Sequence, residues 1–204
     1  MVTPEILTQG RPAMSTGTKR MYCPSCGEEV DTFLMLDGAD ESHHCFFCGV
    51  RLTGEKPVAQ KSLETMLVAE DSAVFREVLQ DRIVEMGIAR EVECADNGEE
   101  FITLFTRRLL KKLPVSVAVM DIRMPQMNGI NAAMALRAIE KGMGVKKPTP
   151  ILFFSSVKCD DNLKQVFQHC APARYINKGN ADSPEQLTDR LLQVLGRLLA
   201  ESKR

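Results

Sequence analysis

From residue 66 onward, short apolar runs alternate with helical patterns, and this alternation constrains the fold more than any other feature of the chain. The runs are MLVAED, EVECAD, VSVAVMD, ILFFSS and RYINK, at residues 66–71, 91–96, 115–121, 151–156 and 174–178. Such near-continuous apolar character is typical of strands that are covered on both faces. Helical stretches between strands of this kind indicate parallel pairing. We therefore expect an α/β domain built on a flavodoxin-like, doubly wound, five-stranded parallel sheet.

The first and last helical stretches also predict which side chains are buried. In the first, Val74, Val78 and either Ile83 or Val84 fall on one face. The last has the clearest start, because Ser183, Pro184 and Gln186 occupy the N-cap, first-turn and capping-box positions. Its apolar stripe consists of Leu187, Leu191, Leu195 and Leu198, with Leu192 and Leu199 beside it as candidates for an exposed partner surface.

Polar residues stand where the predicted strands end. Glu70 and Asp71 close the first strand, Asp121 the third, Ser155 the fourth and Lys178 the fifth. Ligands of open α/β sheets bind beyond the carboxyl ends of the strands, where the winding reverses. Three converging carboxylates repel one another unless a cation lies between them, and Mg²⁺ is a hard ion that suits such ligands. An aspartate can also attack phosphorus, with a lysine neutralising the charge on the transferring group.

Five blocks of the sequence resemble the receiver domain of two-component response regulators. They are LVAEDSAVFREVL, ECADNGEEFI, AVMDIRMPQMNGI, ILFFSSVK and ARYINKG, and the resemblance covers residues 66–204. It implies a phosphoacceptor aspartate with Mg²⁺, two residues that contact the phosphoryl group, and an aromatic switch whose ring turns inward when the aspartate is phosphorylated. The matching residues are Asp121 as phosphoacceptor; Glu70, Asp71, Asp121 and the backbone carbonyl of Arg123 for magnesium; Ser155 and Lys178 for the phosphoryl group; and Tyr175 as switch.

The chain departs from the receiver pattern in two places. Gly179 follows Lys178 where the family usually has proline, and glycine tolerates unusual backbone angles without fixing them. We therefore expect a looser loop after the last strand. The segment KGMGVKKPT also lengthens the connection before the fourth strand. Neither change removes a reacting group.

Four of the seven cysteines form two Cys-x-x-Cys pairs, Cys23 with Cys26 and Cys45 with Cys48, separated by 18 residues. This spacing is typical of a four-thiolate Zn²⁺ site, in which two tight turns face each other. Gly27 and Gly49 stand directly behind the turns, as in a zinc ribbon, which the segment resembles. A redox pair is the rival interpretation. His43 and His44 adjoin the second pair and are expected to be neighbours rather than ligands.

These features divide the chain into a flexible tail at 1–20, a zinc ribbon at 21–52, a linker at 53–65 and the receiver at 66–204. A module as small as the ribbon buries too little surface to fold unaided, so metal binding would supply most of its folding free energy. No output domain is expected after the last helix. Output is then expected to be a contact with another protein.

Charge and composition narrow the partners. The net charge is −1, and the ribbon carries no Lys or Arg between Arg20 and Arg51 but six acidic residues, which disfavours nucleic acid. No signal peptide or membrane-spanning run is apparent, so a cytoplasmic location is expected.

The resemblance implies a histidine kinase or phosphotransfer protein as donor, an unknown output protein, no membrane partner, and a homodimer surface on the fourth and fifth helices. The chain would then be no enzyme beyond its own phosphorylation and dephosphorylation. The alternatives are a transcription regulator that binds DNA through the ribbon, a phosphorylation-independent adaptor, and a phosphatase with an aspartate nucleophile. The phosphatase is disfavoured, because such enzymes typically have a second acid two residues after the nucleophile, where this chain has Arg123.

Overall fold

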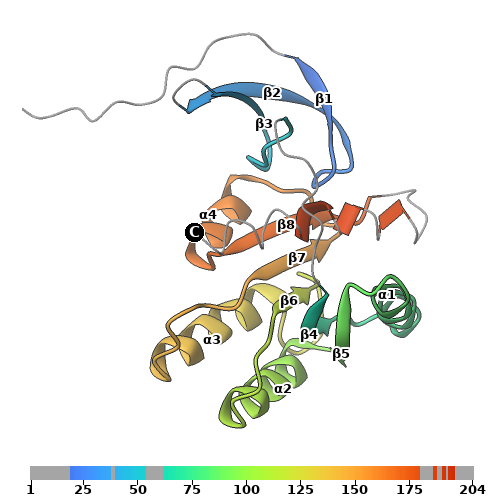
Figure 1. Ribbon diagram of the computed structural model, residues 1–204, viewed down its shortest axis with the longest axis vertical. Coiled ribbons are helices and arrows are strands. Elements are labelled where there is room, and N and C mark those ends of the chain that lie inside the picture. Colours follow the sequence, from blue (N-terminus) through green and yellow to red (C-terminus); the bar gives the residue numbers. More distant parts are fainter. Residues whose placement is uncertain are drawn as a thin grey trace, which may run out of the picture.

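The computed structural model describes residues 19–37, 40–53 and 62–179, together with residues 186, 187, 190, 191 and 193–195 (Figure 1). Most of the predicted tail and linker lie outside these ranges, as does the predicted N-cap at Ser183 and Pro184. Strand β1 includes Arg20 and strand β4 begins at Leu63, so these two strands extend slightly into the segments predicted as tail and linker.

The receiver half contains a five-stranded parallel sheet, as predicted. Its strands are β4 (Leu63–Ala69), β5 (Ala89–Ala95), β6 (Val117–Met120), β7 (Ile151–Ser155) and β8 (Ala173–Asn177). Their order across the sheet is β5-β4-β6-β7-β8. The chain moves from β4 to β5 on one side and then to β6 on the other. The winding therefore reverses between β4 and β6, and β8 is an edge strand.

Helices cover both faces of this sheet. They are α1 (Ala73–Glu85), α2 (Gly98–Leu110), α3 (Gly129–Gly142) and α4 (Asp161–His169), and the described residues between 186 and 195 are helical as well. One core packs residues of α2, α3 and α4, such as Phe101, Leu136 and Leu163, against the sheet. The other core joins α1 and the C-terminal helical residues on the opposite face. This is the doubly wound arrangement that the sequence predicts.

The buried face of α1 differs from the prediction. Val74 and Val84 are 75% and 51% exposed, whereas Leu79 and Ile83 are buried. Phe75 stacks on Phe154 of β7 with ring centroids 5.5 Å apart, which turns the helix by about one residue. The larger apolar side chains, spaced four residues apart, therefore face the sheet, and only the Ile83 alternative of the prediction is confirmed.

The predicted leucine stripe of the last helix is confirmed where the structure describes it. Leu187, Leu191 and Leu195 are all buried in the core shared with α1. Leu192, Leu198 and Leu199 lie outside the described residues. No helix within the described part of the chain is long and apolar enough to cross a lipid bilayer.

A small antiparallel sheet precedes the receiver. It consists of β1 (Arg20–Cys23), β2 (Glu28–Asp37) and β3 (Asp40–Cys45) in the order β1-β2-β3. Among the described residues, its own buried apolar core consists of Cys23, Val30, Cys45 and Val50. Figure 1 shows this module, in blue, on the side of the receiver formed by α4 and β8, away from α2. An N-terminal ribbon therefore packs on one edge of the receiver sheet.

Candidate functional site

Three carboxylates meet at the reversal of the winding. Glu70 and Asp71 follow β4 and Asp121 follows β6, and one oxygen of each lies within 4.8 Å of the others. The backbone N–H of Asp121 donates to the carbonyl of Ala69 at 2.9 Å, so the hydrogen bonding between β4 and β6 continues as far as Asp121. The structure thus brings together the acidic residues that the sequence predicts at this edge.

The ammonium of Lys178 neutralises part of this cluster. Its Nζ lies 2.5 Å from Oε2 of Glu70 and 2.6 Å from Oδ2 of Asp121. These two acidic residues are only 3% and 8% exposed. The same nitrogen lies 4.8 Å from the ring centroid of Phe75, which adds a cation–π contact. Three carboxylates still face one ammonium, so the site keeps an excess of negative charge.

Burial raises the pKa of Glu70 above its ordinary value, although the hydrogen bond from Lys178 opposes this effect. The negative charge of Asp121 raises the pKa of Glu70 further. The backbone also holds Asp121 in position, because its Oδ1 accepts the N–H of Arg123 at 3.0 Å. An open cavity of about 590 Å³ beside Asp71 and Arg123 leaves this side of the cluster accessible to a partner.

Gly129 lets helix α3 start directly behind Asp121. A Cβ atom at Gly129 would lie 2.0 Å from the carbonyl oxygen of Asp121 and 2.9 Å from its carbonyl carbon. The N–H of Gly129 donates to the carbonyl of Ile122 at 3.0 Å. Any side chain at position 129 would therefore displace the backbone that carries Asp121. The block MNG in the sequence carried this information.

The other predicted receiver residues lie at the same edge of the sheet. Ser155 ends β7, is fully buried, and its carbonyl accepts the backbone N–H of Lys178 at 2.9 Å. Tyr175 is 3% exposed, and its hydroxyl donates to the carbonyl of Val157. Burial raises the pKa of Tyr175. The ring of Tyr175 already points inward, in the direction that the sequence assigns to the phosphorylated form.

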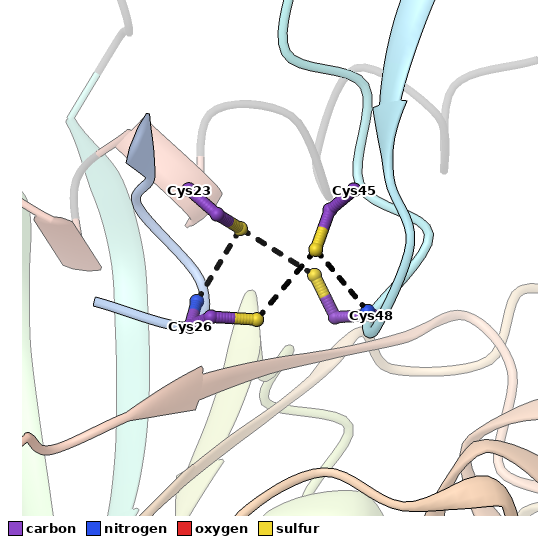
Figure 2. A group of neighbouring side chains, drawn as sticks. All are labelled: Cys23, Cys26, Cys45 and Cys48. Carbon is purple, nitrogen blue, oxygen red and sulfur yellow. Dashed lines mark hydrogen bonds between the residues drawn. The ribbon is translucent and has the colours of Figure 1, made fainter. Parts of the chain in front are cut away.

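The four paired cysteines form a second cluster, shown in Figure 2. The Sγ atoms of Cys23 and Cys48 are 3.6 Å apart, and those of Cys26 and Cys45 are 3.7 Å apart. A tetrahedral zinc ion with Zn–S bonds of about 2.3 Å requires sulfur–sulfur distances of about 3.8 Å. The geometry therefore fits one metal ion that is held tetrahedrally by four thiolates.

The two cysteine turns are near copies of each other. The N–H of Cys26 donates to Sγ of Cys23 at 3.4 Å, and the N–H of Cys48 donates to Sγ of Cys45 at 3.4 Å. The glycines behind them, Gly27 and Gly49, have φ angles of 77° and 73°. We call the turns Cys23–Gly27 and Cys45–Gly49 the first and second knuckle. Their backbone donors stabilise thiolates, as metal knuckles require.

The close packing of the four sulfurs points to a cation as well. Four sulfurs this close cannot all be thiolates unless a positive ion lies among them. The histidines beside the second knuckle have other partners, because His43 pairs with Thr32 and His44 with Ser42 and Gly49. Cys94, Cys159 and Cys170 do not belong to the cluster.

The sequence did not reveal that the first knuckle touches the receiver. The carbonyl of Ser25 accepts the backbone N–H of Asn177 at 2.6 Å, and the hydroxyl of Ser25 donates to the carbonyl of Tyr175. Arg190 donates to the carbonyl of Pro24 at 2.9 Å. No local pattern marks these residues, since their partners lie more than a hundred residues away along the chain.

Comparison with known proteins decides the family of the larger domain. The family model described as "Response regulator receiver domain" matches residues 66–191, which is more than half of the chain. This chain belongs to the response regulator receiver family. The predicted resemblance and fold class are thereby confirmed, and receiver domains of this family are not themselves catalytic modules.

Two curated relatives have names that belong to two-component signalling. "Histidine kinase CKI1" of Arabidopsis thaliana is 35% identical over 91 residues, which cover 41% of this chain and 8% of the kinase. A "Protein-glutamate methylesterase/protein-glutamine glutaminase" of Methanococcus maripaludis is 38% identical over 92 residues, covering 45% of this chain and 22% of that enzyme. The chain thus spans less than a quarter of each of these relatives.

Solved receiver structures agree with the fold. The receiver domain of the histidine kinase CKI1, complexed with Mg²⁺ and BeF₃⁻, superposes with a TM-score of 0.52 at 25% identity and covers 69% of this chain and 89% of that chain. The response regulator domain of Thermotoga maritima CheB gives a TM-score of 0.50 at 26% identity, with 68% and 97% covered.

Proposed function

We propose that this chain is a phosphorylation-dependent signalling protein of the two-component type, which accepts a phosphoryl group on Asp121. One observation carries the proposal. The ammonium of Lys178 bridges Glu70 and Asp121 at 2.5 and 2.6 Å, at the point where the sheet winding reverses. Family membership supports the same chemistry, because the matched segment contains all of these residues.

In the proposed reaction, a carboxylate oxygen of Asp121 attacks the phosphorus of a donor. A new O–P bond forms, the bond from phosphorus to the donor breaks, and the leaving group keeps its electron pair. Lys178 then exchanges its contact with Asp121 for one with a phosphoryl oxygen, and the hydroxyl of Ser155 donates to another. The inward ring of Tyr175 serves as the switch that follows the movement of Ser155.

The acidic cluster fits a magnesium ion. Its three carboxylates outnumber the single ammonium, and their oxygens lie within 4.8 Å of one another. The proposed ligands are Glu70, Asp71, Asp121 and the backbone carbonyl of Arg123. When bound, Mg²⁺ supplies positive charge that neutralises the oxygens of the transferring group.

We further propose that Cys23, Cys26, Cys45 and Cys48 hold a structural zinc ion. The cluster has four sulfur donors at tetrahedral spacing, and four protein ligands leave no coordination position for a substrate, which is the pattern of a structural site. The ribbon core of four buried residues is too small to stabilise the module alone. Zinc would therefore supply folding free energy rather than chemistry.

The proposed partners are a histidine kinase or phosphotransfer protein as donor and another protein as output target, in the cytoplasm. The composition of the ribbon disfavours DNA binding, because the segment between Arg20 and Arg51 carries six acidic residues and four cysteines but no Lys or Arg. A homodimer through α4 and the C-terminal helix would require the ribbon to move, because the first knuckle contacts this side of the receiver. We propose no enzymatic activity beyond self-phosphorylation and dephosphorylation.

The test is intact mass spectrometry of the full chain after incubation with acetyl phosphate and Mg²⁺. The wild type should gain the mass of one phosphoryl group, and Asp121→Asn should gain none. Loss of the adduct when Mg²⁺ is omitted would support the metal site. An unmodified wild type would overturn the proposal in favour of a phosphorylation-independent adaptor. Metal analysis of the same protein should give one zinc per chain, and less in Cys45→Ser.

A further inference from the structure

The first knuckle binds the outer edge of strand β8. Ser25 lies between two zinc-site cysteines and is only 2% exposed. It uses both its carbonyl, which accepts the N–H of Asn177 at 2.6 Å, and its hydroxyl, which donates to the carbonyl of Tyr175. Because β8 is the last strand of the sheet, these backbone groups face away from β7. The knuckle therefore pairs with a sheet edge as a short extra strand would.

Arg190 ties the same two elements together from the C-terminal helix. Its Nε donates to the carbonyl of Pro24 at 2.9 Å, and one terminal nitrogen donates to the carbonyl of Asn177 at 2.6 Å. Arg190 is 4% exposed. Gly27 makes room for it, because a Cβ at Gly27 would lie 2.5–2.9 Å from the guanidinium. One buried cation thus joins the ribbon to the end of β8.

This contact lies next to the phosphoacceptor site. Asn177 directly precedes Lys178, whose Nζ bridges Glu70 and Asp121. Gly179 follows Lys178 with a φ of 73°, and its backbone N–H donates to Oδ1 of Asn177 at 2.7 Å, so Asn177 also holds the chain on the far side of Lys178. The knuckle and Arg190 therefore fix the backbone of the residue that immediately precedes Lys178.

The contact is polar and bordered by unfilled space. Two cavities of about 360 and 610 Å³ adjoin it, lined in part by Phe47 and Phe46 of the second knuckle. Among the described residues, the ribbon core shares no member with either receiver core. A contact of this kind depends on the conformation of Pro24 and Ser25, which the ion held by the flanking cysteines would set.

We propose that zinc occupancy of the ribbon and phosphorylation of Asp121 are thermodynamically linked through the first knuckle, with Ser25 and Arg190 as positioning residues for Lys178. The inference rests on the proposed phosphoacceptor function. The docked knuckle contacts the backbone of Tyr175 while the ring of Tyr175 points inward, the direction implied for the phosphorylated form, so zinc favours that form. Linkage is reciprocal, and the phosphorylated form therefore binds zinc more tightly by the same factor, typically about 5- to 150-fold.

The matched test uses Gly27→Ala and Gly49→Ala in the full chain. Both glycines follow the second cysteine of a knuckle and have nearly the same φ, 77° and 73°. Only Gly27 faces Arg190, whereas an added Cβ at Gly49 meets nothing within 4 Å. The two variants therefore share the backbone strain and differ in the contact with the receiver. Arg190→Met removes the bridge from the receiver side and leaves the ribbon sequence intact.

The measurement is zinc affinity, by competition with a chromogenic chelator, with and without Mg²⁺ and BeF₃⁻ as a phosphoryl analogue. Wild type and Gly49→Ala should bind zinc at least about fivefold more tightly with the analogue. Gly27→Ala and Arg190→Met should show no such gain and should be phosphorylated more slowly by acetyl phosphate than Gly49→Ala.

Two failures are distinguishable. If wild type takes up phosphoryl groups but its zinc affinity ignores the analogue, or if Arg190→Met keeps the full gain, the linkage is refuted and the phosphoacceptor function stands. If wild type takes up no phosphoryl group, the proposed function fails and the inference fails with it.

Discussion

Replacing Lys178 by methionine should destabilise the chain by leaving two buried carboxylates without their cation. In the structure its Nζ contacts Glu70 and Asp121 at 2.5 and 2.6 Å, and its side chain is 16% exposed. Methionine keeps most of the apolar stem but removes the charge, and with it the cation–π contact with Phe75. The change therefore isolates the electrostatic role of the lysine.

The expected cost follows from the spacing of the acids. The carboxylate oxygens lie within 4.8 Å of one another, and unit charges at that distance repel by about 3.5 kcal/mol at an effective dielectric constant of about 20, so closer charges repel more strongly. Removing one partner of a buried ion pair costs about 3–5 kcal/mol. Protonation of Glu70 limits the loss, because its pKa is already raised by burial and the opposing contact with Lys178 disappears. We expect the free energy of unfolding to fall by about 3 kcal/mol at neutral pH.

The assay is urea unfolding in zinc-containing, magnesium-free buffer without chelator. Added Mg²⁺ should restore part of the stability of Lys178→Met, because the ion replaces the missing positive charge. The double variant Lys178→Met/Asp121→Asn should be more stable than Lys178→Met, since one of the repelling charges is gone. The reasoning is refuted if Lys178→Met unfolds like the wild type, or if Asp121→Asn brings no recovery in that background.

Three further predictions concern single groups. The raised pKa of Glu70 means that the folded state binds a proton more tightly than the unfolded state. The contribution of Glu70 to stability therefore falls as the pH rises through the window above 4.5, and the affinity for Mg²⁺ weakens as the pH is lowered into that window. Calorimetric titration of Mg²⁺ into wild type and into Glu70→Gln checks this. Gly129→Ala should lower the free energy of unfolding by about 1–3 kcal/mol and slow phosphorylation, because the added Cβ would overlap the backbone of Asp121. In the control variant Gly142→Ala the added Cβ meets nothing within 4 Å, so the change should be neutral or stabilising. Equal melting temperatures of the two variants would contradict this prediction. Cys45→Ser should abolish stoichiometric zinc binding and the ribbon signals in an NMR spectrum while the receiver signals persist, and an unchanged ribbon spectrum would refute the metal-dependent fold.

The receiver could be predicted in detail because its determinants are local and redundant. Each apolar run ends on a polar residue, and a parallel sheet brings the carboxyl ends of all its strands to one edge. The strands that carry Asp121 and Lys178 flank β7, so both side chains lie at this edge within reach of each other. The cysteine pairs were equally informative, because a Cys-x-x-Cys turn has one geometry that presents both sulfurs.

The face of α1 was harder to predict because its valines and isoleucine give a weak stripe. Phe75, which stacks on Phe154, decides the rotation of the helix, and that partner comes from a distant strand. The docking of the ribbon escaped prediction for a similar reason. Ser25 and Arg190 are polar residues without a local signal, and only the fold places them beside Asn177.

The most direct test of the phosphoacceptor assignment is to locate the modified residue. Borohydride reduces an acyl phosphate to an alcohol, so it should convert phosphorylated Asp121 to homoserine, which peptide mass spectrometry detects. The account predicts homoserine at position 121 alone, after acetyl phosphate and Mg²⁺ and not without them. Modification at Asp71 or another acid, or an adduct that leaves position 121 unchanged, would contradict it.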